Sequence, residues 1–294
     1  MATVRNARWL RLFVLLATLV MIAAACGGDP DAESGDGDGG TDTGNNQQAD
    51  TGDEGAPEFE TKEEGKLIVG SDIPYPPFEM RKGGGYTGLD IDLINEIASR
   101  LELETEIVDT GFDTIFSQLA GGNFDVVVAA ATVTPEREKQ VLFSDAYYVN
   151  QQSLTVPSDS DVQTIDDLQE GDVVAVQNGT TGKAFAEENV PEGVEVRSFP
   201  EGPDTFTALE AGDVDAVIHD EPTALAEIEE RQGLEIVQKI DTGEVYGIAV
   251  DPANEPLLEA INQTLAEMIE DGTYEEIYSK YPSLPPGGNV AAES

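Results

Sequence analysis

The feature that most constrains the fold is an alternation of short apolar runs with amphipathic segments from about Lys66 to Tyr281. Apolar runs bounded by turn residues predict buried strands, and apolar residues at helical spacing predict helices. This order predicts α/β sheets with helices on both faces. We expect strands at 66–70, 105–108, 125–130, 173–177, 216–219 and 246–250, and helices at 90–101, 112–120, 134–141, 180–188, 205–210, 222–231, 255–270 and 274–281.

A weak internal repeat supports two similar units. Leu119, Gly122, Asp125 and Val127 recur 90 positions later as Leu209, Gly212, Asp215 and Val217. In both copies a helix ends at Gly, and an Asp leads into an apolar strand. Ligands of open α/β sheets bind at the carboxyl ends of strands, so we expect the ends of these two strands to line one cleft.

Charge excludes several functional classes. The 294 residues include 59 acidic and 15 basic side chains, for a formal charge of −44. Such a chain is unsuited to binding DNA or RNA through phosphates. One His and one Cys cannot form the usual zinc site or an intrachain disulfide, and a Ser-His-Asp triad could use only His219. We therefore expect no nucleic-acid partner, metal or cofactor.

The amino terminus has the pattern of an export signal. Arg5, Arg8 and Arg11 precede a 14-residue apolar run from Leu12 to Ala25 that is short for a membrane span. The sequence from Ile22 to Gly27 resembles a bacterial lipoprotein box, which implies a signal peptide at 1–25 and lipidation of Cys26. A plain secretory signal is the alternative.

The segment after Cys26 is acidic and poor in apolar residues. We predict a disordered linker at 26–65, since it cannot bury enough surface to offset its ordering entropy. Residues 66–294 still carry 46 acidic and 11 basic side chains, which indicates salt adaptation or, alternatively, ordinary solubility. The tail at 285–294 is expected to be flexible.

Eight motifs in order resemble the polar amino acid binding proteins of ABC importers, solute-binding protein family 3. They span nearly the whole body. The motifs are DIPYPPFE (72–79), GLDIDL (88–93), TVTPER (132–137), FSDAYY (143–148), QNGTTG (177–182), DAVIHDEP (215–222), YGIA (246–249) and DGTY (271–274).

The resemblance implies a two-lobe, type II periplasmic-binding-protein fold, with two α/β sheets joined by two hinge strands around a ligand cleft. The first lobe would comprise 66–153 and 247–284, and the second 154–246. The ligand would be trapped when the lobes close.

A polar amino acid needs a cation for its carboxylate and an anion for its ammonium. The guanidinium of Arg137 suits the first, although a surface ion pair with Glu136 or Glu138 is the alternative. Thr132 would add a hydroxyl and a backbone N–H group. Asp220 suits the ammonium, although it could instead cap the helix that follows.

Other candidates contact the rest of the ligand. The 177–182 segment lacks the spacing of a phosphate-binding loop. The resemblance implies that Thr181 contacts the ligand carboxylate, and the alternative is that Thr180 caps the helix that follows. Tyr75 and Phe112 would enclose the aliphatic stem. Asp72 and Gln177 would face the side chain and favour neutral or cationic ligands, unless Asp72 only caps a turn.

The leading hypothesis is a non-enzymatic, lipid-anchored extracytoplasmic monomer that delivers a polar amino acid to an ABC permease. An enzyme on the same fold, similar to cyclohexadienyl dehydratases, is the second; it would need an acid such as Glu221 or Asp72. A sensory domain is the third, and would need a downstream membrane or kinase segment.

Overall fold

The computed structural model describes residues 59–293. The predicted signal peptide, the lipidation residue Cys26 and most of the acidic linker lie outside the described residues. No helix within 59–293 combines the length and apolar character needed to cross a membrane.

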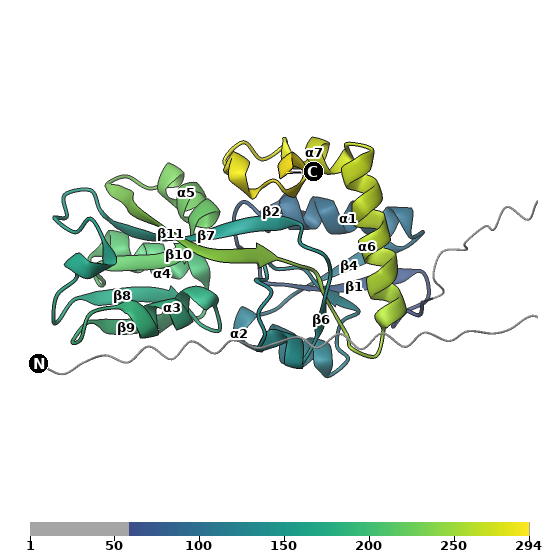
Figure 1. The fold of residues 1–294 in the computed structure, drawn as a ribbon, viewed down its shortest axis with the longest axis horizontal. Helices are drawn as coiled ribbons and strands as arrows, with labels where there is room; N and C mark the ends of the chain where they lie inside the picture. Colours follow the sequence, from purple (N-terminus) through teal and green to yellow (C-terminus); the bar gives the residue numbers. More distant parts are fainter. Residues whose placement is uncertain (1–58, 294) are drawn as a thin grey trace, which may run out of the picture. The chain divides into compact units, whose positions relative to one another are not determined.

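The first sheet has five strands in the order β4-β1-β5-β12-β6. β1 is parallel to β4 and β5, and β12 is antiparallel to β5 and β6. Alternate residues of a strand face opposite sides, so Leu67 and Val69 pack against α1, α6 and α7, whereas Ile68 packs against α2 (Figure 1). The elements are β1 (Lys66–Ser71), β4 (Glu104–Asp109), β5 (Val126–Val127), β6 (Leu142–Phe143), β12 (Ala249–Val250), α1 (Leu89–Arg100), α2 (Phe112–Ala120), α6 (Glu255–Glu270) and α7 (Thr273–Tyr278).

The second sheet has the order β11-β7-β10-β8-β9. β8 is parallel to β9 and β10, while β7 is antiparallel to β10 and β11. Its two faces pack against α3 and against α4 with α5. The elements are β7 (Tyr148–Pro157), β8 (Val173–Gln177), β9 (Glu195–Phe199), β10 (Ala216–Asp220), β11 (Leu234–Tyr246), α3 (Thr181–Asn189), α4 (Gly202–Ala211) and α5 (Glu221–Glu230).

Two long strands link the sheets. β7 follows β6 of the first sheet in the sequence, and β11 leads back to β12 of that sheet. The chain therefore crosses between the sheets twice (Figure 1). β7 and β11 pair from Tyr148↔Tyr246 to Leu234↔Pro157, with a register irregularity between Ile240 and Glu244. A small hairpin, β2 (Met80–Lys82) and β3 (Gly85–Thr87), precedes α1.

The sequence repeat corresponds to a repeated structural unit. Gly122 and Gly212 both adopt positive φ at the end of a helix, at 81° and 74°. The carboxylate of Asp125 then accepts the backbone N–H of Ile68 at 2.7 Å, and that of Asp215 accepts the N–H of Val173 at 2.8 Å. Each Asp thus ties the start of its strand to the neighbouring parallel strand in the same way.

Two segments differ from the sequence predictions. The helix expected at 134–141 is only a 3-10 turn, Arg137–Lys139. The strand expected at 125–130 is reduced to β5, and the chain turns at Ala130 with φ 43°. The tail also differs from the flexible segment expected: the 3-10 turns Pro286–Gly288 and Val290–Glu293 fold back, and Val290 packs against the first core. One further 3-10 turn covers Ile165–Asp167.

Candidate functional site

Most predicted site residues lie where strands end and helices begin. Asp72 follows β1, Gln177 ends β8 and Asp220 ends β10, while Phe112 and Thr181 begin α2 and α3. Thr132 and Arg137 follow β5, and Tyr75 lies in the loop after β1. Because parallel strands end at one edge of a sheet, the topology gathers these side chains from both sheets.

One small cavity collects seven of the eight predicted residues. Ala129, Ala130 and Thr180 complete its lining, and Asp72 lies next to it, bonded to Gln177. The predicted members are Tyr75, Phe112, Thr132, Arg137, Gln177, Thr181 and Asp220.

Arg137 is held by backbone carbonyls and aromatic rings. Its Nη1 donates to the Thr132 carbonyl at 2.6 Å and its Nη2 to the Gly179 carbonyl at 3.1 Å. Its guanidinium carbon lies 5.0 Å and 4.7 Å from the ring centres of Phe112 and Phe116. Burial lowers its pKa to about 10, against the opposing effect of nearby carboxylates, so it stays charged at neutral pH.

The surface ion pair considered for Arg137 is not formed. Within 59–293, no carboxylate lies within 4 Å of its guanidinium in an ion pair, and Glu136 instead pairs with Lys139. The planar group is therefore free of a competing acid and can bind a carboxylate through two N–H groups.

Asp220 is the centre of a buried hydrogen-bond network. Its Oδ2 accepts from Tyr75 at 2.5 Å and from Tyr246 at 2.7 Å. Its Oδ1 accepts from Asn150 at 2.8 Å and also from Gln152. Burial raises its pKa, and the four donors oppose that shift by stabilising the ionised form.

The helix-cap alternative for Asp220 is not observed. The residue occupies the position before α5, but its side chain makes no capping hydrogen bond there. Asp220 instead lines the cavity, with its carboxylate at the centre of the network.

Glu244 is a second buried carboxylate that the sequence analysis missed. Its Oε2 accepts from Thr132 Oγ1 at 3.1 Å, from Asn150 at 3.0 Å and from Gln152 at 3.1 Å. Burial and then the nearby Asp220 raise its pKa. No local sequence signal marked Glu244, because its partners Thr132 and Asn150 lie 112 and 94 residues away in the sequence.

Asp72 and Gln177 meet across the two sheets. Gln177 Nε2 donates to Asp72 Oδ2 at 2.7 Å, while Gln177 Oε1 is buried without a hydrogen-bond partner. Burial raises the pKa of Asp72 to about 7, despite the bond from Gln177. The Asp72 carboxyl group and Gln177 Oε1 are thus two acceptors for hydrogen-bond donors on a ligand side chain.

The remaining residues support the cavity walls. Thr180 caps α3 by accepting the Lys183 N–H at 3.1 Å, as a helix cap would. The ring of His219 lies 5.1 Å from that of Tyr75, and burial lowers the pKa of its imidazole to about 4, so it is neutral. Within the described residues, no cluster of His, Cys, Asp or Glu is arranged to hold a metal ion.

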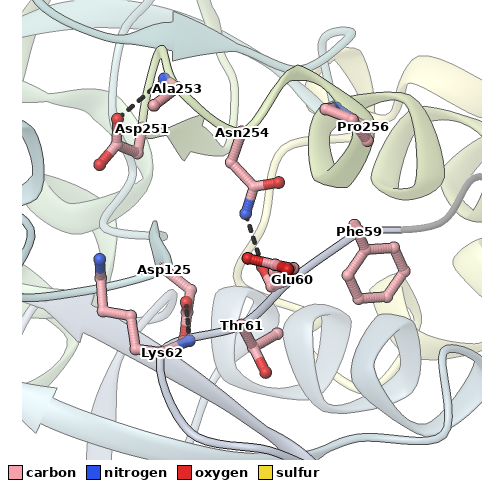
Figure 2. Close-up of a pocket in the computed structure, with 9 residues that line it drawn as sticks. All are labelled: Phe59, Glu60, Thr61, Lys62, Asp125, Asp251, Ala253, Asn254 and Pro256. Carbon is pink, nitrogen blue, oxygen red and sulfur yellow. Dashed lines mark hydrogen bonds between the residues drawn. The ribbon is translucent and has the colours of Figure 1, made fainter.

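A larger surface pocket lies at the opposite edge of the first sheet. Lys62 and Asp125 precede β1 and β5, whereas the site residues follow those strands. Figure 2 shows hydrogen bonds between some of its polar groups: the backbone N–H of Lys62 bonds to Asp125 at 2.8 Å, and Asn254 bonds to the Glu60 carbonyl at 2.8 Å. We therefore take the smaller cavity between the sheets as the candidate site.

Known proteins resemble this chain over the whole folded body. The chain is 32% identical over 225 residues to the ABC transporter glutamine-binding protein GlnH of Bacillus subtilis (strain 168), covering 75% of this chain and 82% of the relative. The structure of an ancestral arginine-binding protein bound to glutamine matches with a TM-score of 0.72 and 40% identity, over 76% of this chain and 100% of that one.

A second solved structure bears on the enzyme alternative. The ancestral amino acid-binding protein AncCDT-1, a precursor of cyclohexadienyl dehydratase, matches with a TM-score of 0.70 and 36% identity, over 74% of this chain and 95% of that chain. The solved structures confirm the predicted two-lobe, type II fold, and the named relatives are binding proteins, not enzymes.

The family model for bacterial extracellular solute-binding proteins, family 3, matches residues 67–283. This span contains both sheets and every residue that lines the cavity. The chain therefore belongs to the bacterial extracellular solute-binding proteins of family 3.

Proposed function

We propose that this protein captures a polar L-amino acid with a neutral or cationic side chain and delivers it to an ABC permease. The observation that carries the proposal is the placement of Arg137 and Asp220 around one cavity. A fork-shaped cation and a carboxylate match the two charged groups that every α-amino acid carries. Relatives named for glutamine and arginine binding support the same class of ligand.

Each part of the ligand has a complementary group. Arg137, with the hydroxyl of Thr132 and the amino end of α3 at Thr181, receives the carboxylate. Asp220 receives the ammonium. Tyr75 and Phe112 enclose the aliphatic stem, and the side chain extends toward Asp72 and Gln177.

Closure of two lobes is part of the proposal. We assign 66–153 with 247–284 to the first lobe and 154–246 to the second. Hydrogen bonds of the site cross that division, among them those of Arg137 with Gly179, Asp72 with Gln177, and Tyr75 with Asp220. These contacts have to separate for ligand to enter, and β7 with β11 forms the connection about which the lobes would rotate.

The cavity is better suited to binding than to catalysis. Glu221, one of the two acids considered for a dehydratase, is only 4% exposed and forms an ion pair with Lys239. Asp72 faces Gln177, and within residues 59–293 no second acid or base forms a hydrogen bond with its carboxyl group. Incubation with a cyclohexadienyl carboxylate should therefore give no product; turnover would favour the enzyme alternative.

The anchor and location follow from the sequence. We propose that Cys26 is lipidated and holds the protein outside the cytoplasmic membrane as a monomer beside its permease, with the linker predicted at 26–65 as a spacer. The matching family is extracellular by description, which supports an extracytoplasmic location.

The test is a thermal-shift screen of the twenty amino acids followed by calorimetry. A ligand at 100 times its Kd adds about 2.7 kcal/mol of stability. Arg137→Ala and Asp220→Ala should each weaken binding at least about tenfold, or about 1.4 kcal/mol. Matched controls are Lys139→Ala and Asp213→Ala, which remove exposed charges outside the cavity and should leave Kd unchanged. Wild-type affinity in Arg137→Ala or in Asp220→Ala would contradict the assignment of that residue to the ligand site.

A further inference from the structure

Two further acids, Glu79 and Asp90, lie buried behind the cavity wall, apart from Arg137 and Asp220. Glu79 and Asp90 are both 0% exposed. Asp90 Oδ2 accepts the Ala130 N–H at 2.7 Å and the Tyr147 hydroxyl at 2.8 Å. Within residues 59–293, Asp90 Oδ1 and both oxygens of Glu79 have no hydrogen-bond partner. Three unpaired buried carboxyl oxygens are costly, so this arrangement needs an explanation.

The backbone forces the two acids together. Gly88 adopts φ 133°, and a Cβ there would lie 1.9 Å from the Phe78 carbonyl. The Asp90 N–H also donates to that carbonyl at 3.2 Å. This bond places Asp90 beside the chain at Phe78, whose next residue is Glu79, and both acids are buried there.

Two ionised carboxylates can only accept hydrogen bonds, so they cannot pair with each other. A single proton between them provides a donor and satisfies one oxygen of each acid. The proton belongs on Glu79, because two donors already stabilise the charge of Asp90.

We propose that protonated Glu79 donates a hydrogen bond to Asp90, and that this buried acid pair positions two walls of the ligand cavity. Glu79 and Asp90 are positioning residues, since neither lines the cavity itself. The proposal rests on the proposed function only in taking that cavity as the ligand site.

The first wall is the segment around Ala130. Its φ of 43° is unfavourable for a residue with a Cβ, and its N–H is held by Asp90. Ala130 lines the cavity, and Thr132, two residues later, presents its carbonyl to Arg137. A shift of Ala130 would therefore move the support of the guanidinium.

The second wall is the loop that carries Tyr75. Tyr75 and Glu79 exchange two backbone hydrogen bonds, at 2.8 Å and 3.0 Å. The hydroxyl of Tyr75 then bonds to Asp220. The Glu79–Asp90 bond thus links the Tyr75 wall to the Ala130 wall through one proton.

The electrostatic surroundings agree. Burial, then Asp90, raises the pKa of Glu79 well above its ordinary value, and Asp72 adds to the effect. The other titratable groups that face the pair are Tyr147, whose hydroxyl bonds to Asp90, Tyr75 and Tyr274. Because the folded-state pKa is raised, the bond is present at low and neutral pH and is lost as pH rises through that pKa.

The first experiment compares wild type with Glu79→Gln by calorimetry from pH 6 to pH 10, using the amino acid that the screen selects. Gln keeps an N–H donor toward Asp90 but has no proton to lose. Taking the ratio of the two Kd values removes the titration of the ligand itself. We expect the ratio of wild-type Kd to Glu79→Gln Kd to be near 1 at pH 7 and to rise where Glu79 loses its proton. A Glu79→Gln variant that binds at least about tenfold more weakly than wild type at pH 7 overturns the proposal, because Gln keeps the donor.

The second experiment needs no ligand. In wild type labelled with ¹⁵N-alanine, the Ala130 amide signal should shift with pH, since that amide bonds to Asp90. In Glu79→Gln this shift should be absent, because Gln has no proton to lose. A shift caused by the titration of Asp72 would remain in that variant. Equal titration in both proteins overturns the proposal. Glu192→Gln, an exposed acid, is the charge control and should behave as wild type.

The two experiments separate this inference from the proposed function. If no amino acid binds, the proposed function fails but the amide titration still tests the acid pair. If an amino acid binds and the amide does not titrate, only the acid pair fails. Should Glu79→Gln not fold, the titration of Ala130 in wild type is compared with that in Asp72→Asn; loss of the shift in Asp72→Asn would overturn the proposal.

Discussion

Replacing Asp72 by Asn should make the ligand-free protein more stable at alkaline pH and weaken its binding of a cationic amino acid. The Asp72 carboxyl is 3% exposed, and burial, opposed by the bond from Gln177, raises its pKa from 3.8 to about 7. Asn keeps an oxygen that can accept the Gln177 N–H and cannot ionise. The substitution therefore isolates the effect of one buried charge.

The magnitude follows from linkage. Below pH 3.8 the carboxyl is protonated in both the folded and the unfolded chain, so it causes no difference. Between 3.8 and about 7 the folded state holds a proton that the unfolded state has released, and stability falls as pH rises through that window. At 1.36 kcal/mol per pKa unit, the loss reaches an upper bound of about 4 kcal/mol.

The stability gap between variant and wild type should therefore widen with pH. The quantity to compare is the free energy of unfolding of Asp72→Asn minus that of wild type. We expect this difference to be about 3 kcal/mol larger at pH 8 than at pH 5. Urea denaturation followed by circular dichroism, at one fixed salt concentration, measures both values. Asp161→Asn removes an exposed charge and should show no such widening.

Binding should change in the other direction. A cationic ligand favours ionised Asp72, so its affinity for wild type should rise between pH 6 and pH 8, by at most about tenfold per unit. Asp72→Asn should bind it more weakly and without that rise. A constant stability gap, or tight binding of glutamate by wild type, would refute the assignment of Asp72 as a buried acid facing the ligand side chain.

Three further predictions concern the network, the anchor and the charge. Glu244→Leu removes the acceptor of Thr132 and Asn150 and should raise Kd at least about tenfold by calorimetry, whereas Glu244→Gln, which keeps an acceptor oxygen, should lose less. Cys26→Ser should move the protein from the membrane to the soluble fraction on cell fractionation; unchanged retention would contradict lipidation. Raising salt from 10 mM to 1 M shortens the Debye length from about 30 Å to about 3 Å, so the melting temperature should rise substantially, and a flat curve would contradict salt adaptation.

Much of the fold was predictable because its signals are local. Apolar runs gave the strands, helical spacing gave most helices, and the repeated Gly–Asp pattern marked two equivalent units. The helix expected at 134–141 was wrong. Pro135 suits the first turn of a helix, but this local signal does not include the packing of Arg137 over Phe112 and Phe116, for which the chain makes only a 3-10 turn. The tail differed because Val290 finds an apolar surface that is built from distant segments.

The sequence by itself determined the fold class and the candidate clamp, since strand ends and motif positions select Arg137, Asp220 and their neighbours without coordinates. Only the tertiary structure brought Glu244 to Thr132, 112 residues away, and Glu79 against Asp90. An acid in a mostly acidic sequence carries no mark of its environment. Whether its charge is solvated or buried, and therefore whether its pKa is ordinary or raised, depends on which remote groups the fold places beside it.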